Sequence, residues 1–279
     1  MTLASLRINL IKWSIMILPE RALLALMKFH YARVLRTVSE DFVAEFRIIK
    51  ALVTPGDQAI DLGAHVGIYT KFLSTLVGLE GRVFSVEPFP FNFAILSSNV
   101  RRLRLQNVRP INCAVSDAEG RATMEVPNFS LSGESFWDAR IAYEDSNPTL
   151  RRAEVSVKPL DSIFPELTGV SFIKCDVEGK ELQTLMGAEK LIERNKPAWL
   201  LEVSIMDPLL HDQIRELLSR SGYMEVWFTG KELKPWEPGD RPVDTFFLQP
   251  QQLKRAKESA LSSVDGSTKD IAVALGVSA

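Results

Sequence analysis

The stretch that most constrains the fold covers residues 58–70, with the sequence QAIDLGAHVGIYT. It begins as a short apolar strand that reaches Asp61, turns between Gly63 and Gly67, and continues as a helix-like run. A carboxylate at a strand end, a glycine turn and a helix N-terminus form a corner at which α/β proteins bind nucleotide-like ligands. Glycine suits the turn because it allows close backbone approach and positive φ. The stretch therefore predicts an α/β domain with a ligand site at this corner.

The glycine spacing distinguishes between two classes of cofactor. A dinucleotide fingerprint has the pattern G-x-G-x-x-G, whereas Gly63 and Gly67 are four positions apart with His65 between them. Asp61 stands two residues before the first glycine, where it would repel an anionic pyrophosphate but suit the amine and sulfonium of S-adenosylmethionine. An NAD-linked oxidoreductase is therefore disfavoured. A strand–turn–helix corner without a ligand remains the alternative.

Short apolar strands alternate with helix-like runs along the chain, which is typical of a parallel, doubly wound sheet. After the first strand, we expect strands over residues 81–87, 108–115, 170–176, 199–202, 225–228 and 245–248. We expect helices over residues 68–76, 91–103, 180–193 and 209–218, and one that begins after Ser39 or Asp41 and ends at Leu52. The connection between the last two strands is rich in proline and too short for a helical crossover, so these strands should be antiparallel.

Composition and the two cysteines limit the function classes. With 33 basic and 35 acidic residues the net charge is −2, which gives no support for a nucleic-acid partner. Cys113 and Cys175 lie in strand-like runs, where we expect buried, reduced thiols. The N-terminus has no convincing secretory cleavage site, so we expect a cytoplasmic protein. Residues 127–148 hold aromatic side chains without periodicity and predict a lid or binding loop, with a poorly ordered loop as the alternative.

The two ends of the chain differ from its middle. Residues 1–39 carry six basic residues and one acid, with apolar runs on both sides of Pro19, and predict two helices broken at that proline. These helices could form a cap on the domain or on a second subunit of a homo-oligomer, or lie at the inner membrane surface. The domain organisation is thus an N-terminal extension over residues 1–44, a catalytic domain over 45–250 and a tail over 251–279. In the tail we expect a surface helix followed by a disordered end.

Four motifs stand out along the chain: IDLGAHVGIYT at 60–70, VEP at 86–88, CAVSD at 113–117 and FIKCDVEGKE at 172–181. With these motifs the chain resembles the FkbM-type family of S-adenosylmethionine-dependent methyltransferases, over roughly residues 45–250. The last motif, with its DVEG core, is the most family-specific. The family usually has Asn where this chain has His65. The resemblance implies a Rossmann-like class I fold with seven mostly parallel strands, the last antiparallel. It implies methyl transfer, usually to oxygen, on sugars, glycans, polyketides or related small molecules.

The resemblance also assigns roles to individual residues. It implies that Asp61, Gly63 and Gly67 line the methionyl end of the cofactor, that Glu87 holds the ribose and that Asp117 approaches the adenine amine. Asp176 and Glu178 would lie at the mouth between cofactor and acceptor. The remaining expected cofactor contacts are Ala64, His65, Thr70, Pro88, Ser116 and Asp176.

A hydroxyl acceptor benefits from a base that takes its proton. Asp176, Glu178 and Glu202 are the candidates, because they follow strands whose ends face the site. Each could instead bind cofactor or interact with a helix N-terminus. We expect no metal site, because the acidic residues form no clear ligand cluster. We expect His30 and His211 to lie on the surface. A non-catalytic protein that keeps the fold is the alternative to an enzyme.

Overall fold

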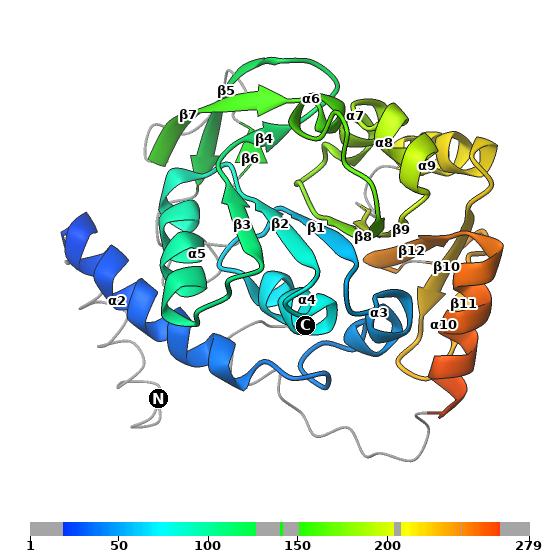
Figure 1. Ribbon diagram of the computed structural model, residues 1–279. Coiled ribbons are helices and arrows are strands. Elements are labelled where there is room, and N and C mark those ends of the chain that lie inside the picture. The colour runs from blue at the N-terminus through cyan, green and yellow to red at the C-terminus, as the bar shows by residue number, and fades with distance from the viewer. Residues whose placement is uncertain (1–18, 127–139, 142–150, 204–207, 241, 263–279) are drawn as a thin grey trace, which may run out of the picture.

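The computed structural model describes residues 19–126, 140–141, 151–203, 208–240 and 242–262. Its centre is an eight-stranded sheet with the order β11-β10-β12-β9-β8-β1-β2-β3 (Figure 1). Its strands are β1 (Gln58–Leu62), β2 (Arg82–Val86), β3 (Val108–Ile111), β8 (Val170–Cys175), β9 (Ala198–Glu202), β10 (Met224–Phe228), β11 (Leu233–Pro235) and β12 (Asp244–Leu248). The strands β3, β2, β1, β8 and β9 are parallel. Strand β12 runs antiparallel to both of its neighbours, β9 and β10. The Rossmann-like methyltransferase sheet with an antiparallel last strand is thereby confirmed, and β11 extends its edge by one strand beyond the expected seven.

Helices cover both faces of this sheet and bury its apolar strands. On one face, α3 (Phe46–Leu52), α4 (Ile68–Val77) and α10 (Pro250–Ser262) enclose a core that includes Phe172 and Phe246. On the other, α6 (Leu160–Ile163), α8 (Glu189–Asn195) and α9 (Pro208–Arg220) enclose a core around Trp199 and Phe247. All four of these aromatic side chains are at most 1% exposed. Apolar residues on both faces explain why the strands read as continuous hydrophobic runs.

The third expected strand is two separate strands. Strand β3 ends at Ile111, and β4 (Ala114–Val115) leaves the main sheet to pair with β7 (Arg151–Lys158). Strands β4, β7, β5 (Gly120–Val126) and β6 (Arg140–Ile141) form a second sheet, in the order β4-β7-β5-β6. The break follows from Asn112, whose side-chain amide donates to the carbonyls of Glu87 and Pro88 and turns the chain.

Two expected helices are also shorter than the sequence suggests. Residues 39–45 form turns closed by Phe42 N–H to Ser39 O and Phe46 N–H to Val43 O, so α3 begins only at Phe46. The run over 180–193 divides into α7 (Glu181–Met186) and α8. The division falls at Gly187, where an added Cβ would lie 2.1 Å from the carbonyl oxygen of Ser116. The helices expected over 91–103 and 209–218 are confirmed as α5 (Pro90–Arg102) and α9.

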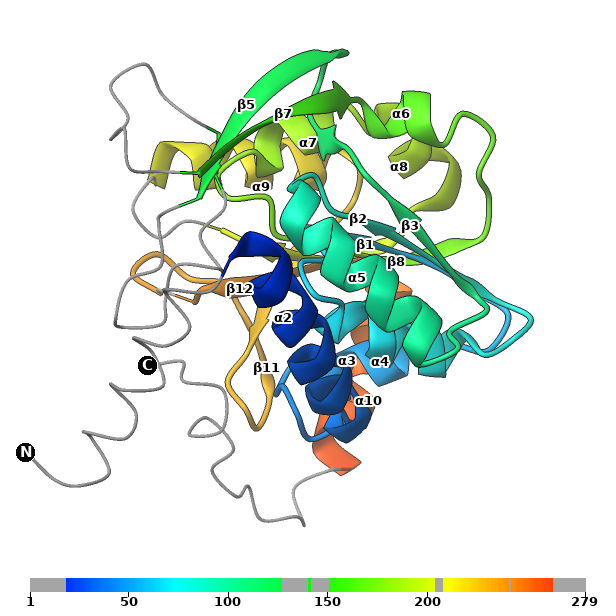
Figure 2. The same cartoon turned by 90° about the vertical axis from the view of Figure 1, so that its left-hand side faces the viewer.

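The part of the N-terminal extension that the structure describes packs on the domain. Helix α2 (Glu20–Val34) lies along α5, as two views show (Figures 1 and 2), and leads into the short helix η1 (Leu35–Thr37). Its residues Leu23 and Tyr31 are buried in a cluster with side chains of α5 and the second sheet. Phe29, on the same helix, is 57% exposed. Contact with a membrane or a second subunit stays a prediction, and the expected helix before Pro19 lies outside the described residues.

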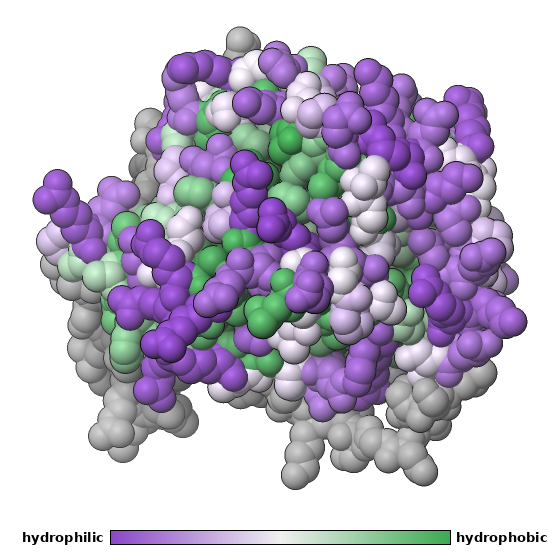
Figure 3. Space-filling model, in the orientation of Figure 1, coloured by the Kyte–Doolittle hydropathy of each residue, from purple (hydrophilic) through white to green (hydrophobic). Residues whose placement is uncertain are grey.

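Most of the molecular surface in the orientation of Figure 1 is hydrophilic, with hydrophobic side chains gathered near the middle of this face (Figure 3). None of the helices in the described part of the chain is long and apolar enough to cross a membrane. Cys113 and Cys175 are buried and free, as expected. The lid expected over 127–148 lies outside the described residues except for β6, and so does the end of the tail beyond α10.

Candidate functional site

The site is built around the turn between β1 and α4, which holds three residues in left-handed backbone conformations. Gly63, His65 and Gly67 have φ values of +69°, +48° and +101°. A Cβ at Gly63 would lie 1.7 Å from the carbonyl oxygen of Asp176, so only glycine lets these two backbone segments meet. The turn after β1 and the loop after β8 are therefore in direct contact at the carboxyl ends of neighbouring strands.

Glu87 holds this turn through its carboxylate. Its Oε2 accepts from the backbone N–H of His65 at 2.8 Å, and its Oε1 accepts from Phe89 N–H at 2.9 Å. Burial raises the pKa of Glu87 to about 7, although both hydrogen bonds favour the charged form. The side chain is only 4% exposed. The ribose contact expected for Glu87 stays a prediction, and the structure adds a second role, which is to fix the turn.

Two asparagines that the sequence did not single out also fix the corner. The side-chain amide of Asn99, on α5, donates to Val66 O at 2.9 Å. Asn112 donates to the carbonyls of Glu87 and Pro88 at 2.8 and 2.9 Å. A polar residue on a helix or after a strand carries no local signal for such a contact, because its partner is distant in the chain.

Asp61 is fully buried at the end of β1. Its Oδ2 accepts from the Thr70 hydroxyl at 2.5 Å, and that hydroxyl also lies 2.8 Å from Ser85 Oγ. Burial raises the pKa of Asp61, while the nearby Lys174 ammonium and the Thr70 hydroxyl act in the opposite direction. The other oxygen, Oδ1, is buried and has no hydrogen-bond partner among the residues that the structure describes. Thr70 thus supports Asp61 directly, and its expected cofactor contact stays a prediction.

Lys174, inside strand β8, places a buried cation beside Asp61 and Asp176. Its Nζ donates to Asp176 Oδ2 at 2.6 Å and lies 5.1 Å from the centre of the Tyr69 ring. Burial lowers the pKa of Lys174, but the carboxylates of Asp176 and Asp61 outweigh it and raise this pKa above its usual range. Burial also acts to raise the pKa of Asp176, yet the Lys174 ammonium lowers it overall. Asp176 is therefore ionised at neutral pH.

Glu202 and Asp244 lie beside this ion pair. Glu202 ends β9, and its side chain is hydrogen-bonded to that of Asp176. Burial and the charge of Asp176 raise the pKa of Glu202 to about 9, so this carboxyl carries a proton at neutral pH. Asp244 begins β12 in register with Glu202, and burial together with Glu45 raises its pKa to about 7. The sequence did not indicate Lys174, Asp244 or Glu45 as site residues.

The loop after Asp176 separates two acids with different environments. Glu178 is exposed and has a φ of +55°, so it sits on the outside of the turn. Glu181, at the start of α7, is 1% exposed and accepts from the backbone N–H groups of Val177 and Gly179 at 3.2 and 3.1 Å. Glu181 thus shapes the loop from within, whereas the side chain of Glu178 is exposed.

The expected adenine side lies after β4. Ser116 Oγ donates to Asp117 Oδ1 at 3.0 Å, and Asp117 is exposed. The Ser116 carbonyl approaches Gly187 so closely that a side chain there would collide with it. Ala64 is buried and Pro88 is half-buried beside the glycine turn. Asp61, Glu87, Asp176 and Glu202 thus lie at the ends of strands of the main sheet, whereas Ser116 and Asp117 follow β4 of the second sheet. The contacts of all these residues to cofactor stay predictions.

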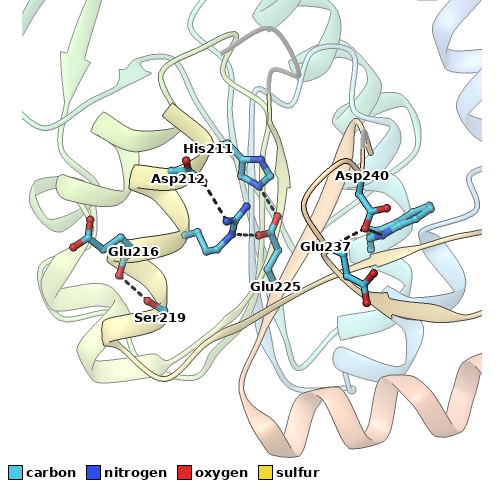
Figure 4. A network of polar contacts seen from close by, with 9 residues as sticks. His211, Asp212, Glu216, Ser219, Glu225, Glu237 and Asp240 are labelled. Carbon is cyan, nitrogen blue, oxygen red and sulfur yellow. Dashed lines mark hydrogen bonds and ion pairs between the residues drawn. The ribbon is translucent and has the colours of Figure 1, made fainter. Parts of the chain in front are cut away.

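A second polar cluster, between α9 and β10, lies outside this group (Figure 4). His211 Nε2 lies 2.5 Å from Glu225 Oε1, and Arg215 Nε donates to Glu225 Oε2 at 2.8 Å. The Arg215 guanidinium is 3.6 Å from the centre of the Trp236 ring. His211, expected at the surface, is only partly exposed, because this contact leaves 16% of its side chain accessible. His30 is exposed, as expected.

Comparison with known proteins identifies the family. The model of the methyltransferase FkbM domain matches residues 61–224, which is more than half of the 279 residues. The chain belongs to the FkbM methyltransferase family. Its members depend on S-adenosylmethionine, which confirms the expected cofactor and the family resemblance. No curated protein matches the chain.

Solved structures similar to this FkbM methyltransferase include methyltransferase FkbM from Methylobacillus flagellatus KT. It is 21% identical, the match covers 74% of this chain and 50% of that one, and the TM-score is 0.45. The chain thus spans half the length of that protein. Fibrillarin from Aeropyrum pernix with natively bound S-adenosyl-L-methionine is 16% identical over 70% of this chain and 67% of its own, with a TM-score of 0.41. A SAM-dependent O-methyltransferase from Thermotoga maritima is 16% identical over 73% and 63%, also with a TM-score of 0.41.

The residues present suit a positively charged cofactor. The buried Oδ1 of Asp61 is an acceptor without a partner in the described structure, and it lies at the glycine turn. The carboxyl groups of Asp61, Asp176, Glu202 and Asp244 surround the single ammonium of Lys174. A cationic ammonium or sulfonium would offset this excess of acid. Among the described residues, no group of three or more His, Cys, Asp or Glu side chains is arranged to hold a metal ion.

Proposed function

We propose that this FkbM methyltransferase transfers a methyl group from S-adenosylmethionine to a hydroxyl oxygen of a sugar, glycan, polyketide or related small molecule. The observation that carries this proposal is that the interacting carboxyl groups of Asp176 and Glu202 follow the neighbouring parallel strands β8 and β9, with Lys174 Nζ 2.6 Å from Asp176 Oδ2. Methylation of a hydroxyl releases a proton, and this pair offers carboxyl groups to receive it. Glu178, whose side chain is exposed, remains a candidate for the same role.

The charge of the site favours a hydroxyl over two other acceptors. A carboxylate acceptor would meet the ionised Asp176 and the partly ionised Asp244, and like charges at close range repel. An amine would be held as its ammonium ion by the same acids, and an ammonium nitrogen has no lone pair with which to attack. A neutral hydroxyl group avoids both difficulties.

The chain's own contribution would be positioning, desolvation and proton transfer. The bound cofactor supplies an electrophilic methyl group. Asp61 and the glycine turn would hold its charged end, and Glu87 with Asp117 would hold its nucleoside. In-line transfer depends strongly on the alignment of the reacting atoms, and alignment alone can contribute about 7–11 kcal/mol. The rigid contacts of Gly63 and Glu87 to the neighbouring backbone support such alignment.

The acceptor can be found with methyl-labelled S-adenosylmethionine and fractionated cell extracts. Under the proposal, a small-molecule or glycan fraction gains a label that withstands mild base, because methyl ethers survive conditions that hydrolyse methyl esters. Glu202→Gln should strongly reduce labelling while the cofactor still binds. Label lost to base as methanol, or label on nitrogen, would overturn the hydroxyl acceptor. A folded protein that binds cofactor and labels no fraction would favour the non-catalytic alternative, whereas binding of NAD would favour an oxidoreductase.

We further propose that the protein works in the cytoplasm, with its N-terminal extension serving as a cap. The two buried free thiols suit a reducing compartment, and α2 already packs on α5. A peripheral location at the inner membrane surface would require the basic residues of the extension to face lipid. Sedimentation with vesicles containing anionic lipid tests this: no binding at low salt supports the cap, and salt-sensitive binding supports the membrane surface.

A further inference from the structure

Four neighbouring strands bring carboxyl groups to one place on one face of the sheet. Asp61 on β1 is in register with Lys174 on β8, and Asp244 on β12 is in register with Glu202 on β9. Lys174 is also in register with Leu200, two positions before Glu202, so the side chains share a face. Asp176 follows Lys174 by two positions and shares that face as well. We refer to Asp61, Asp176, Glu202 and Asp244 as the carboxyl row.

The carboxyl row contains more acid than its surroundings neutralise. Lys174 contributes one ammonium group, bonded to Asp176 at 2.6 Å. The other titratable groups that face the row come from the elements packed around it: Glu45 before α3, Tyr69 on α4 and His65 in the glycine turn. Burial raises the pKa of Tyr69 well above its usual value, so its phenol stays neutral. One cation thus stands against several acids, and the row relieves its excess charge by retaining protons.

Glu202 is the main carrier of such a proton. Its side chain is hydrogen-bonded to Asp176, which Lys174 keeps ionised, so the proton of this pair resides on Glu202. Its pKa of about 9 lies above that of Asp244, at about 7, and therefore Glu202 loses its proton last as the pH rises. Removing this proton would leave Glu202 and Asp176 as two adjacent carboxylates, with Lys174 as the cation beside them.

Two observations make the surroundings of the row suitable for a cationic ligand. The buried Oδ1 of Asp61 lacks a hydrogen-bond partner among the described residues. The glycine turn also contacts the backbone of Asp176, because the position of a Cβ on Gly63 lies 1.7 Å from the Asp176 carbonyl oxygen. A ligand held by the turn would bring its charge close to Asp61 and Asp176. A positive charge there stabilises ionised carboxylates and lowers their affinity for protons.

We propose that the carboxyl row responds to the charge of the cofactor: Glu202 gives up its proton when S-adenosylmethionine binds and keeps it when S-adenosylhomocysteine binds. The two compounds differ by the methyl group and its sulfonium charge. The proposal rests on the proposed function, since it takes this edge of the sheet as the cofactor site. It goes beyond the proposed function, because it gives Glu202 a protonation state that depends on whether the methyl donor is bound.

This behaviour supplies the proton acceptor only when it is needed. With the donor bound, Glu202 is a carboxylate. During transfer the acceptor's O–H bond breaks and its proton passes to Glu202, while the new C–O bond forms. The methyl–sulfur bond breaks and leaves its electron pair on sulfur, which becomes neutral. Loss of the positive charge restores the proton affinity of Glu202, so the proton taken from the acceptor is retained until the product leaves.

Calorimetric titration of the full chain with each compound provides the test. The binding heat is measured near pH 8 in two buffers of different ionisation enthalpy, which yields the number of protons released. We expect S-adenosylmethionine to release about half to one proton more than S-adenosylhomocysteine. The ratio of the two affinities should shift toward S-adenosylmethionine by up to about tenfold per pH unit between pH 7 and 9.

Glu202→Gln isolates the contribution of Glu202 to proton release, because any proton that the ligands themselves release is the same in the variant and in the unaltered protein. This variant should lose the difference in proton release, while the control Glu232→Gln, an exposed acid between β10 and β11, should keep it. Asp244→Asn should lose only a minor part of the difference in proton release. Equal proton release with both compounds in the unaltered protein would overturn the inference and leave the proposed function standing. An unchanged difference in Glu202→Gln would also overturn it, whereas failure of both compounds to bind would overturn the proposed function too.

Discussion

Lys174 Nζ lies 2.6 Å from Asp176 Oδ2, and this buried pair sets the protonation of the acids around it. Lys174 is 6% exposed, whereas the side chain of Asp176 is 26% exposed and reaches the edge of the site. The lysine therefore acts on the carboxylate from its buried side. It stabilises the ionised form of Asp176 without itself reaching the position where an acceptor would bind.

Lys174→Met should destabilise the fold markedly. It removes the cation from a buried pair, a change that typically costs about 3–5 kcal/mol. The pKa of Asp176 is lowered in the folded protein, so the stability that this pair contributes is present above about pH 4 and is lost as the pH falls through the lowered pKa. Urea unfolding of both proteins at several pH values should show their difference shrinking under acidic conditions. A constant difference down to pH 2 would contradict the assigned charges.

Glu202 should make the protein less stable as the pH rises. Its pKa is raised in the folded state from 4.5 to about 9, and so its contribution is fully present below pH 4.5 and is lost as the pH rises toward 9. Glu202→Gln cannot ionise and should flatten this part of the profile. The measurement is the free energy of unfolding across pH 5 to 9. A variant profile parallel to that of the original protein would show that the carboxyl is not protonated at neutral pH.

Gly63→Ala should be among the most damaging small substitutions in the chain. Its Cβ would be placed 1.7 Å from the Asp176 carbonyl oxygen, at a φ of +69°. Crowding and backbone strain together should cost about 3 kcal/mol or more. Gly56→Ala is the matched control, because Gly56 has a φ of +93° but no heavy atom within 4 Å of the added Cβ. Thermal unfolding should show a clearly smaller loss for Gly56→Ala, and similar losses would mean that the close contact is unimportant.

Glu87→Gln should weaken both the fold and cofactor binding. The carboxylate uses both oxygens to accept backbone N–H groups, but an amide has only one acceptor oxygen. One buried N–H, of His65 or Phe89, would then face an NH₂ group, at a cost of about 1–3 kcal/mol. Unfolding experiments and calorimetry with S-adenosylmethionine measure the two effects. Weaker cofactor binding in a protein of unchanged stability would show that Glu87 contacts the ribose and does little for the turn.

The sequence predicted those parts of the site that lie at the carboxyl ends of parallel strands. Asp61, Glu87, Asp176 and Glu202 could be found because each ends an apolar run, and such ends meet at one edge of the sheet. Asp244 was missed because it begins an antiparallel strand, and only the register with Glu202 brings it to that edge. These positions are fixed by sheet topology, which the order of strands largely reveals.

Other features depended on contacts that local patterns do not encode. Lys174 reads as an ordinary residue of a strand until its burial beside two acids is known. The division of the 180–193 helix at Gly187 follows from the approach of Ser116, which is 71 positions earlier in the sequence. The second sheet was missed because its strands β5 and β7 are separated by a long segment without periodicity. Its pairing depends on distant backbone partners.

The packing of α2 shows that the physical domain is larger than the family match. That match begins at residue 61, yet the ring of Tyr31 lies edge-on to His65 with centroids 6.4 Å apart. Leu35 is 1% exposed, and its Cδ1 lies 3.9 Å from the Cβ position of Gly67. A helix that precedes the shared sequence thus forms one wall of the glycine turn. Relatives that share the motif but have other N-terminal segments would hold the same turn against different walls, so their cofactor affinities could diverge without any change in the motif itself.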